Sequence, residues 1–148
     1  MSHIARKASA VLLAACGTLG IAVAAPASAA DYPTDSFFVS KTDGSTTNSY
    51  TSGTITWYNR TAGITGAVVD LQAGAYTVAY FEAFAGATKI DSQTRSANDE
   101  SDLGQRRTFT FTIGDSDLVG GIDRVKVTVC THYPSATFCS APENYSRG

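Results

Sequence analysis

Few residues of this 148-residue chain belong to the types that carry out covalent or acid–base chemistry. Beyond residue 30 there is a single histidine, His132, and a nucleophilic serine would need it as a base. No G-x-S-x-G turn is present to expose such a serine. A glycosidase needs two carboxylates across a cleft, but Glu82 is the only glutamate within an expected strand, and spacing places no second carboxylate beside it. We therefore predict that the protein is not an enzyme.

Two acidic clusters suggest calcium as a ligand. Asp115, Asp117 and Asp123 form one cluster, and residues 98–102 form the other. The two lie at opposite ends of an expected strand, about 20 Å apart at the β rise, so they cannot share one ion. We expect solvated turns, with a calcium site in a single loop as the alternative. The prediction is therefore no metal and no cofactor.

Cys130 and Cys139 are the other reactive pair, with eight residues between them. The third cysteine, Cys16, falls within the export signal described below. An exported chain meets an oxidising compartment, so we expect a disulfide between Cys130 and Cys139. Zinc is the weaker alternative, because one histidine and two cysteines at these spacings do not complete a zinc set.

The N-terminus has the three parts of a secretory signal. Arg6 and Lys7 make a basic start, residues 8–25 form an apolar run, and Pro-Ala-Ser-Ala at 26–29 supplies the A-x-A cleavage pattern. We predict a signal peptide over 1–29 and a secreted, extracellular product with no membrane segment after its removal. Leu-Ala-Ala-Cys ending at Cys16 is similar to a lipobox, so a lipoprotein attached through Cys16 is the minor alternative.

The expected mature chain is small and mildly acidic. Removing 29 of 148 residues leaves 119, in which 9 Lys and Arg face 13 Asp and Glu, a net charge of −4. That length supports one domain with a core of its own. The acidity argues against nucleic acid as a partner, because proteins that bind a phosphate backbone present a basic patch.

Residues 54–148 carry a β pattern, and no segment keeps a 3.6-residue period. Phe109, Phe111 and Ile113 alternate with threonines, as in a sheet with one face in water. We predict an all-β fold, an antiparallel, Ig-like, Greek-key β-sandwich of about seven strands. The expected strands cover 54–58, 66–71, 75–85, 88–92, 107–113 and 124–130.

The segment Leu-Gln-Ala-Gly-Ala-Tyr at 71–76 resembles the tyrosine corner of Ig-like sandwiches. There a tyrosine near the start of a strand hydrogen-bonds back across the preceding turn. The resemblance implies this role for Tyr76. A glycine turn followed by an ordinary strand tyrosine is the alternative, since the usual Asp before the glycine is missing.

Residues 30–53 are polar and rich in Ser, Thr, Asp and Gly, apart from Phe37, Phe38 and Val39. Such a stretch buries little by itself, so we predict a flexible N-terminal arm that precedes a sandwich domain over 54–148. A first or edge strand of the fold is the alternative for the apolar cluster.

A mobile segment with one apolar patch can add a strand to a partner or fill its groove. Under this hypothesis, deleting residues 30–45 abolishes partner capture while the domain stays folded. The predicted partner-binding residues are Tyr32, Phe37, Phe38 and Val39.

Aromatic residues offer a second mode of binding. In 75–85, Tyr76, Tyr80 and Phe84 share one face, which stacks on sugar rings if it is exposed and forms core if it faces the other sheet. A carbohydrate- or cell-wall-binding module, with polysaccharide as partner, is therefore an alternative function. Its predicted sugar-binding residues are Trp57, Tyr80 and Tyr133.

The Ala-rich signal, small β-domain and single late disulfide are similar to those of many small secreted proteins of filamentous soil bacteria. Within that group, the arm at 30–53 followed by a compact sandwich resembles the adaptor subunit of umbrella toxin particles. The resemblance implies a protein-interaction module that links a lectin-like subunit to a large toxin subunit, so its partner would be another secreted protein. A small secreted inhibitor that presents residues 132–135 from the disulfide loop is a further alternative.

Overall fold

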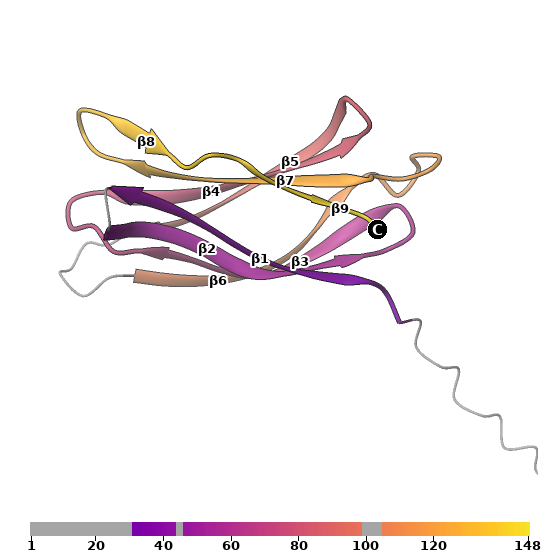
Figure 1. Ribbon diagram of the computed structural model, residues 1–148, viewed down its shortest axis with the longest axis horizontal. Coiled ribbons are helices and arrows are strands. Elements are labelled where there is room, and N and C mark those ends of the chain that lie inside the picture. Colours follow the sequence, from indigo (N-terminus) through magenta and orange to yellow (C-terminus); the bar gives the residue numbers. More distant parts are fainter. Residues whose placement is uncertain (1–30, 44–45, 99–104) are drawn as a thin grey trace, which may run out of the picture. The chain divides into compact units, whose positions relative to one another are not determined.

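The computed structural model describes residues 31–43, 46–98 and 105–148, and all regular structure there is β (Figure 1). The described part holds no helix long and apolar enough to cross a membrane. The predicted signal peptide and Cys16 lie outside the described residues. The nine strands are β1 (Thr34–Asp43), β2 (Thr46–Trp57), β3 (Thr61–Asp70), β4 (Tyr76–Ala85), β5 (Thr88–Asn98), β6 (Gln105–Gly114), β7 (Arg124–His132), β8 (Thr137–Cys139) and β9 (Glu143–Ser146).

The strands form two antiparallel sheets that lie on each other as layers (Figure 1). The first sheet has the order β1-β2-β3-β6, and the second has the order β5-β4-β7-β8, with β9 also paired to β7. The chain leaves the first sheet after β3, returns as β6 beside β3, and leaves again as β7 beside β4. These crossings are those of a Greek-key sandwich, so the predicted fold class is confirmed, with more strands than expected.

Alternation along the strands sets which side chains form the core. Val125, Val127 and Val129 of β7 are fully buried, and they lie directly opposite Ala83, Phe81 and Ala79 of β4. Their neighbours in sequence point to the outer face of the same sheet. The period of two that predicted β7 therefore also predicted its buried face.

An aromatic cluster fills the middle of the sandwich above a pair of glycines. The rings of Phe37 and Phe109 pack against Phe81 at centroid distances of 5.9 and 5.4 Å. Gly53 and Gly66 lie opposite each other on β2 and β3, and a methyl on Gly66 would stand 2.2 Å from the backbone oxygen of Ser52. The side-chain-free backbone leaves the space that these two rings occupy.

The prediction of a flexible arm over 30–53 is wrong, and so is the domain boundary at 54. These residues supply β1 and most of β2, and 31–148 form one compact unit. Phe37 and Val39 are 3% and 2% exposed because β1 turns them into the core. Ser36 and Ser40 lie with Phe38 on the outward face of this alternation, which polar side chains favour, whereas Ser49 and Thr51 of β2 are buried.

The predicted disulfide between Cys130 and Cys139 is confirmed, with the sulfurs 2.03 Å apart. The two cysteines lie directly opposite each other on β7 and β8. The residues after Cys139 continue as β9, which pairs with the other end of β7. The C-terminal segment is thus a broken edge strand of the second sheet rather than a loose tail.

Candidate functional site

His132 is held by three neighbours on the outer face of the second sheet. Its ring stacks on Tyr76 with centroids 4.7 Å apart, its Nε2 lies 3.4 Å from the hydroxyl of Tyr80, and its Nδ1 lies 3.0 Å from the hydroxyl of Thr137. These contacts orient the ring, but none comes from a carboxylate that could support the histidine as a base. These contacts indicate that the side chain of His132 links β7 to β4 and β8.

Tyr76 does not form the predicted tyrosine corner. Its ring is 46% exposed and lies flat against His132, with an angle of 6° between the planes. The alternative, a glycine turn followed by an ordinary strand tyrosine, describes it. Gly74 in that turn has φ +72°, which glycine adopts without strain.

A hollow of about 590 Å³ opens on the same outer face, between β5 and β8. Tyr80 lines it together with Thr94, Thr128, Thr137 and the disulfide. Aromatic rings framed by hydroxyl groups suit a ligand that has both apolar faces and hydrogen-bonding groups.

The three predicted sugar-binding residues do not come together. Trp57 is 2% exposed, and its indole nitrogen donates to the carboxylate of Asp35 at 2.7 Å, so it cannot stack on a ligand. Tyr80 lines the hollow on the second sheet. Tyr133 lines a separate one of about 470 Å³, beside Phe138 and Lys41. Trp57 was predicted to bind sugar because the sequence of this half-polar strand does not show whether its tryptophan faces the core or the solvent.

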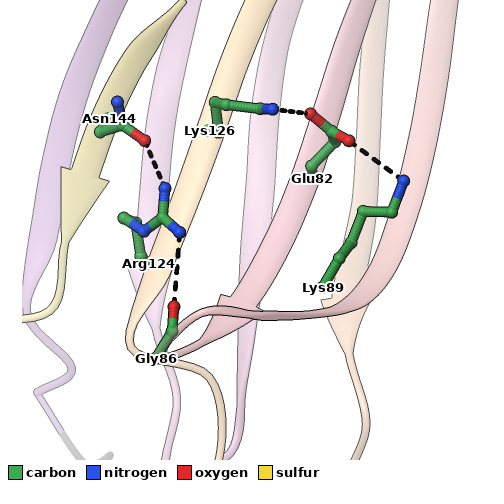
Figure 2. Close-up of polar contacts among 6 residues, drawn as sticks. All are labelled: Glu82, Gly86, Lys89, Arg124, Lys126 and Asn144. Atoms are coloured by element: carbon green, nitrogen blue, oxygen red, sulfur yellow. Dashed lines mark hydrogen bonds and ion pairs between the residues drawn. The ribbon is translucent and has the colours of Figure 1, made fainter.

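Charged groups line the end of the outer face next to the β4–β5 turn (Figure 2). The carboxylate of Glu82 lies between the ammonium groups of Lys126 on β7 and Lys89 on β5, the latter 3.2 Å away. The hydrogen bond from Lys126 lowers the pKa of Glu82, against a smaller opposing effect of burial. Arg124 lies over the ring of Phe84 at 4.1 Å and donates to Asn144 at 2.7 Å.

The loop inside the disulfide is a closed hairpin. The backbone nitrogen of Tyr133 donates to the oxygen of Ala136 at 2.8 Å, which leaves Pro134 and Ser135 at the tip. The ring of Tyr133 meets Phe138 at a centroid distance of 6.0 Å. The tip of the loop is therefore a tight turn.

Acidic side chains around the β6–β7 connection accept hydrogen bonds from backbone N–H groups. Asp123 accepts from the nitrogen of Gly86 at 2.8 Å, and Asp115 accepts from the nitrogen of Asp117 at 2.8 Å. The described ranges contain no group of three or more His, Cys, Asp or Glu that could hold a metal ion. Most of the other acidic segment, 98–102, lies outside the described residues.

The four predicted partner-binding residues point in different directions. Phe37 and Val39 belong to the core. Tyr32 lies just before β1, and its ring packs edge-on against that of Tyr58. Phe38 is 60% exposed on the outer face of the first sheet, and its ring lies 5.3 Å from that of Tyr50.

Tyr50 on β2 pairs with Val69 on β3, so an apolar group spans three strands; Val69 is only 6% exposed, and the accessible part of the group is Phe38 and Tyr50. We call Phe38, Tyr50 and Val69 the Phe38 patch. The prediction missed Tyr50 and Val69, because their distance in sequence from Phe38 hides a proximity that only the strand register creates.

The sheet edges differ in charge. β6 carries Arg106 and Arg107 at its edge, and β5 carries Lys89, Asp91 and Arg95. Such charges discourage another strand from pairing with an edge. β1, whose described pairing is with β2 alone, is uncharged over 36–40.

No family model, no curated protein and no solved structure matches this chain. The functional proposal therefore rests on the surfaces of the molecule itself.

Proposed function

We propose that this protein is a secreted, non-catalytic protein-interaction module that takes up a strand of its partner at the edge of β1. The observation that carries the proposal is an uncharged edge with Phe38 60% exposed beside it. The proposed surface lies on β1, within the segment whose residues were predicted from the sequence to bind a partner, and that segment is a strand of the fold. The partner is another secreted protein, as for an adaptor that joins the subunits of a toxin particle.

In strand addition at an edge, the backbone and the side chains of β1 contribute to binding in different ways. The free side of an edge strand offers a row of N–H and C=O groups, which supply affinity without selecting a sequence. Selectivity then comes from side chains near the edge. Phe38, on β1 itself, is the large exposed apolar group that an incoming strand would meet, and Tyr50 on β2 packs against its ring from the side away from the free edge.

Capture from the culture medium tests this proposal. Tagged protein should retain a partner, and the Phe38→Asp variant should lose it, because a charge blocks strand addition. Val119 is 91% exposed in the β6–β7 connection, so Val119→Asp makes the same change away from β1 and should keep the partner. Retention by Phe38→Asp, or equal loss by both variants, would overturn the proposal. Mass spectrometry of the retained protein shows whether it is a toxin subunit.

Secretion is a separate part of the proposal. The cleavage pattern at 26–29 supports it, and a disulfide is compatible with it. N-terminal sequencing of the extracellular protein should begin at residue 30. A lipidated Cys16 at the N-terminus of a membrane-bound product would contradict it.

The hollow on the second sheet favours a second candidate function, saccharide binding. Tyr80, whose ring could stack on a sugar, lines it together with three threonines. Protein retained on an insoluble polysaccharide should be released by Tyr80→Ala and kept by Tyr80→Phe, which preserves the ring. Equal retention of wild type and Tyr80→Ala would exclude this site.

A further inference from the structure

The residues before and after Phe38 in β1 correspond in pairs at equal distance from it: two apolar residues, two serines, and two residues of opposite charge. Reading outward from Phe38, the chain has Phe37 and Val39, then Ser36 and Ser40, then Asp35 and Lys41. We infer that the strand taken up at the β1 edge is β1 of a second copy of this chain. This inference rests on the proposed strand addition at the edge of β1, and it replaces the other secreted protein by a second copy of the same chain.

An antiparallel pair of β1 strands related by a twofold axis at Phe38 places complementary residues opposite each other. In such a pair, residue 35 of one copy faces residue 41 of the other, and the same contact occurs twice because the axis repeats it. Each carboxylate therefore meets an ammonium group. The facing residues would be Asp35 with Lys41, Ser36 with Ser40, Phe37 with Val39, and Phe38 with Phe38.

The side chains that must meet lie on the same side of the strand. Asp35 and Lys41 alternate with the outward-facing residues, so they share the side of Phe37 and Val39. Both are half-buried. Asp35 is already oriented by the indole of Trp57, and Lys41 borders the hollow beside Tyr133.

The regular part of β1 has the length that this register needs. A β-bulge interrupts the pairing of β1 with β2 between Lys41 and Thr42. The stretch from Asp35 to Lys41 precedes the bulge and is centred on Phe38. Beyond Lys41 the bulge changes the direction of the edge, which ends the surface available to a second copy.

Pairing with a second copy would replace one contact that the free side of β1 makes with β9 of its own chain. The carbonyl of Pro33 accepts from the backbone nitrogen of Trp57 on β2, and the pairing stays regular up to Lys41. Every second residue after Pro33 therefore turns its N–H and C=O to β2, and Phe38 turns its own to the free side. Tyr145 of β9 lies at this side: its ring is 6.2 Å from that of Phe37, and a hydrogen bond with the backbone of Phe38 lowers the pKa of its hydroxyl, against the larger raising effect of burial. The hydroxyl is thus close to a position that the backbone of the second copy would take. Removing this hydroxyl should therefore favour the dimer.

Sedimentation velocity of the secreted protein over a range of concentrations tests the inference. The expected result is a reversible monomer–dimer equilibrium. Lys41→Asp should weaken it by about tenfold or more, because it sets two pairs of like charges opposite each other. Tyr145→Phe should strengthen it. Arg107→Asp makes the same change of charge on the β6 edge and should leave it unaltered. A monomer at all concentrations, or a dimer equally affected by Lys41→Asp and Arg107→Asp, overturns the inference.

Cysteine cross-linking tests the register. Phe38→Cys should form disulfide-linked dimers on mild oxidation, because position 38 faces its own copy. Ser36→Cys and Ser40→Cys should each fail to cross-link alone and should cross-link when mixed. Cross-linking of Ser36→Cys alone, or failure of the mixture, contradicts this register.

The two proposals fail in different ways. If the protein is monomeric while Phe38→Asp still loses a retained partner, the second copy is wrong and strand addition by another protein stands. If the dimer forms in this register and no other protein depends on Phe38, the partner is the chain itself. If neither is observed, both proposals are wrong.

Discussion

Adjacent residues of one strand have opposite roles at the residue scale. Phe37 packs against Phe81 and lies 6.2 Å from the ring of Tyr145, whereas Phe38 lies on the outer face beside Tyr50. A sequence that contains Phe-Phe-Val does not show which phenylalanine is buried until the register of the strand is known. The four residues predicted as one binding patch were therefore divided between core and surface.

Truncating each phenylalanine separates the two roles. We expect Phe37→Ala to lower the free energy of unfolding by about 3 kcal/mol, because it leaves a cavity in the aromatic cluster. Phe38→Ala should change it by less than about 0.5 kcal/mol, since the ring is mostly in water. Urea unfolding of the two variants measures both values. If both substitutions have equal, small effects on the free energy of unfolding, Phe37 does not stabilise the core and the prediction of a flexible arm over 30–53 is restored.

Glu82 gives the stability a dependence on pH. Its pKa is lowered in the folded state, chiefly by the hydrogen bond from Lys126, so its contribution is present above its unfolded pKa and is lost as the pH falls through the folded value. The pair is partly in water, so the contribution is small, about 0.5 kcal/mol.

Unfolding at neutral pH and at pH 3 should show this contribution as a difference between wild type and Glu82→Gln. The variant should be less stable than wild type at pH 7, and the two should converge at pH 3. A difference that persists at pH 3 would assign the effect to packing of the side chain rather than to its charge.

At the scale of elements, β1 is an integral part of the sandwich. It contributes Phe37 and Val39 to the core, and its backbone pairs with β2 from Thr34 to Asp43. Deleting residues 30–45 should therefore unfold the domain or lower its melting temperature by many degrees, instead of leaving it folded. Circular dichroism on heating measures this. A deletion variant that melts like wild type would show that β1 is dispensable.

β8 depends on the disulfide because it is only three residues long and all three are exposed. Replacing Cys130 and Cys139 by Ala should lower the free energy of unfolding by about 2.5 kcal/mol on the chain-entropy model. Hydrogen exchange should become faster in β8 than in β4. Wild-type protein under reducing conditions is the control and should resemble the variant; if β8 stays protected in both, its strand pairing is sufficient without the bond.

At the scale of the whole molecule, the sequence predicted the sandwich and its edge strands β5 and β6, but not the edge strands β1, β8 and β9. Alternating valines and phenylalanines marked β6 and β7 because one face of each is buried. β1 stood only as the alternative to a flexible arm, and the first half of β2 was missed, because Ser and Thr give a strand the composition of a disordered segment. In β2 even the buried positions Ser49 and Thr51 are polar. β8 and β9 were missed because strands of three and four residues show no period. The Phe38 patch and the hollow around Tyr80 depend on strand register, which residue order alone does not reveal.

The two ends of the compact unit meet at one end of the sandwich, where Tyr32 and Gly148 border the same small hollow. A pull applied between these ends acts on β1 and β9 from that side, so the strand pairs would open one after another, starting with Thr34 from Thr56 and Ser146 from Arg124. On the C-terminal side this opening stops at Cys139, where a covalent bond passes the tension directly to β7 in the middle of its sheet. On the N-terminal side, the described strands contain no such stop. Under mechanical load the molecule should therefore yield first at β1, which is also the strand that the proposed second copy would hold in place.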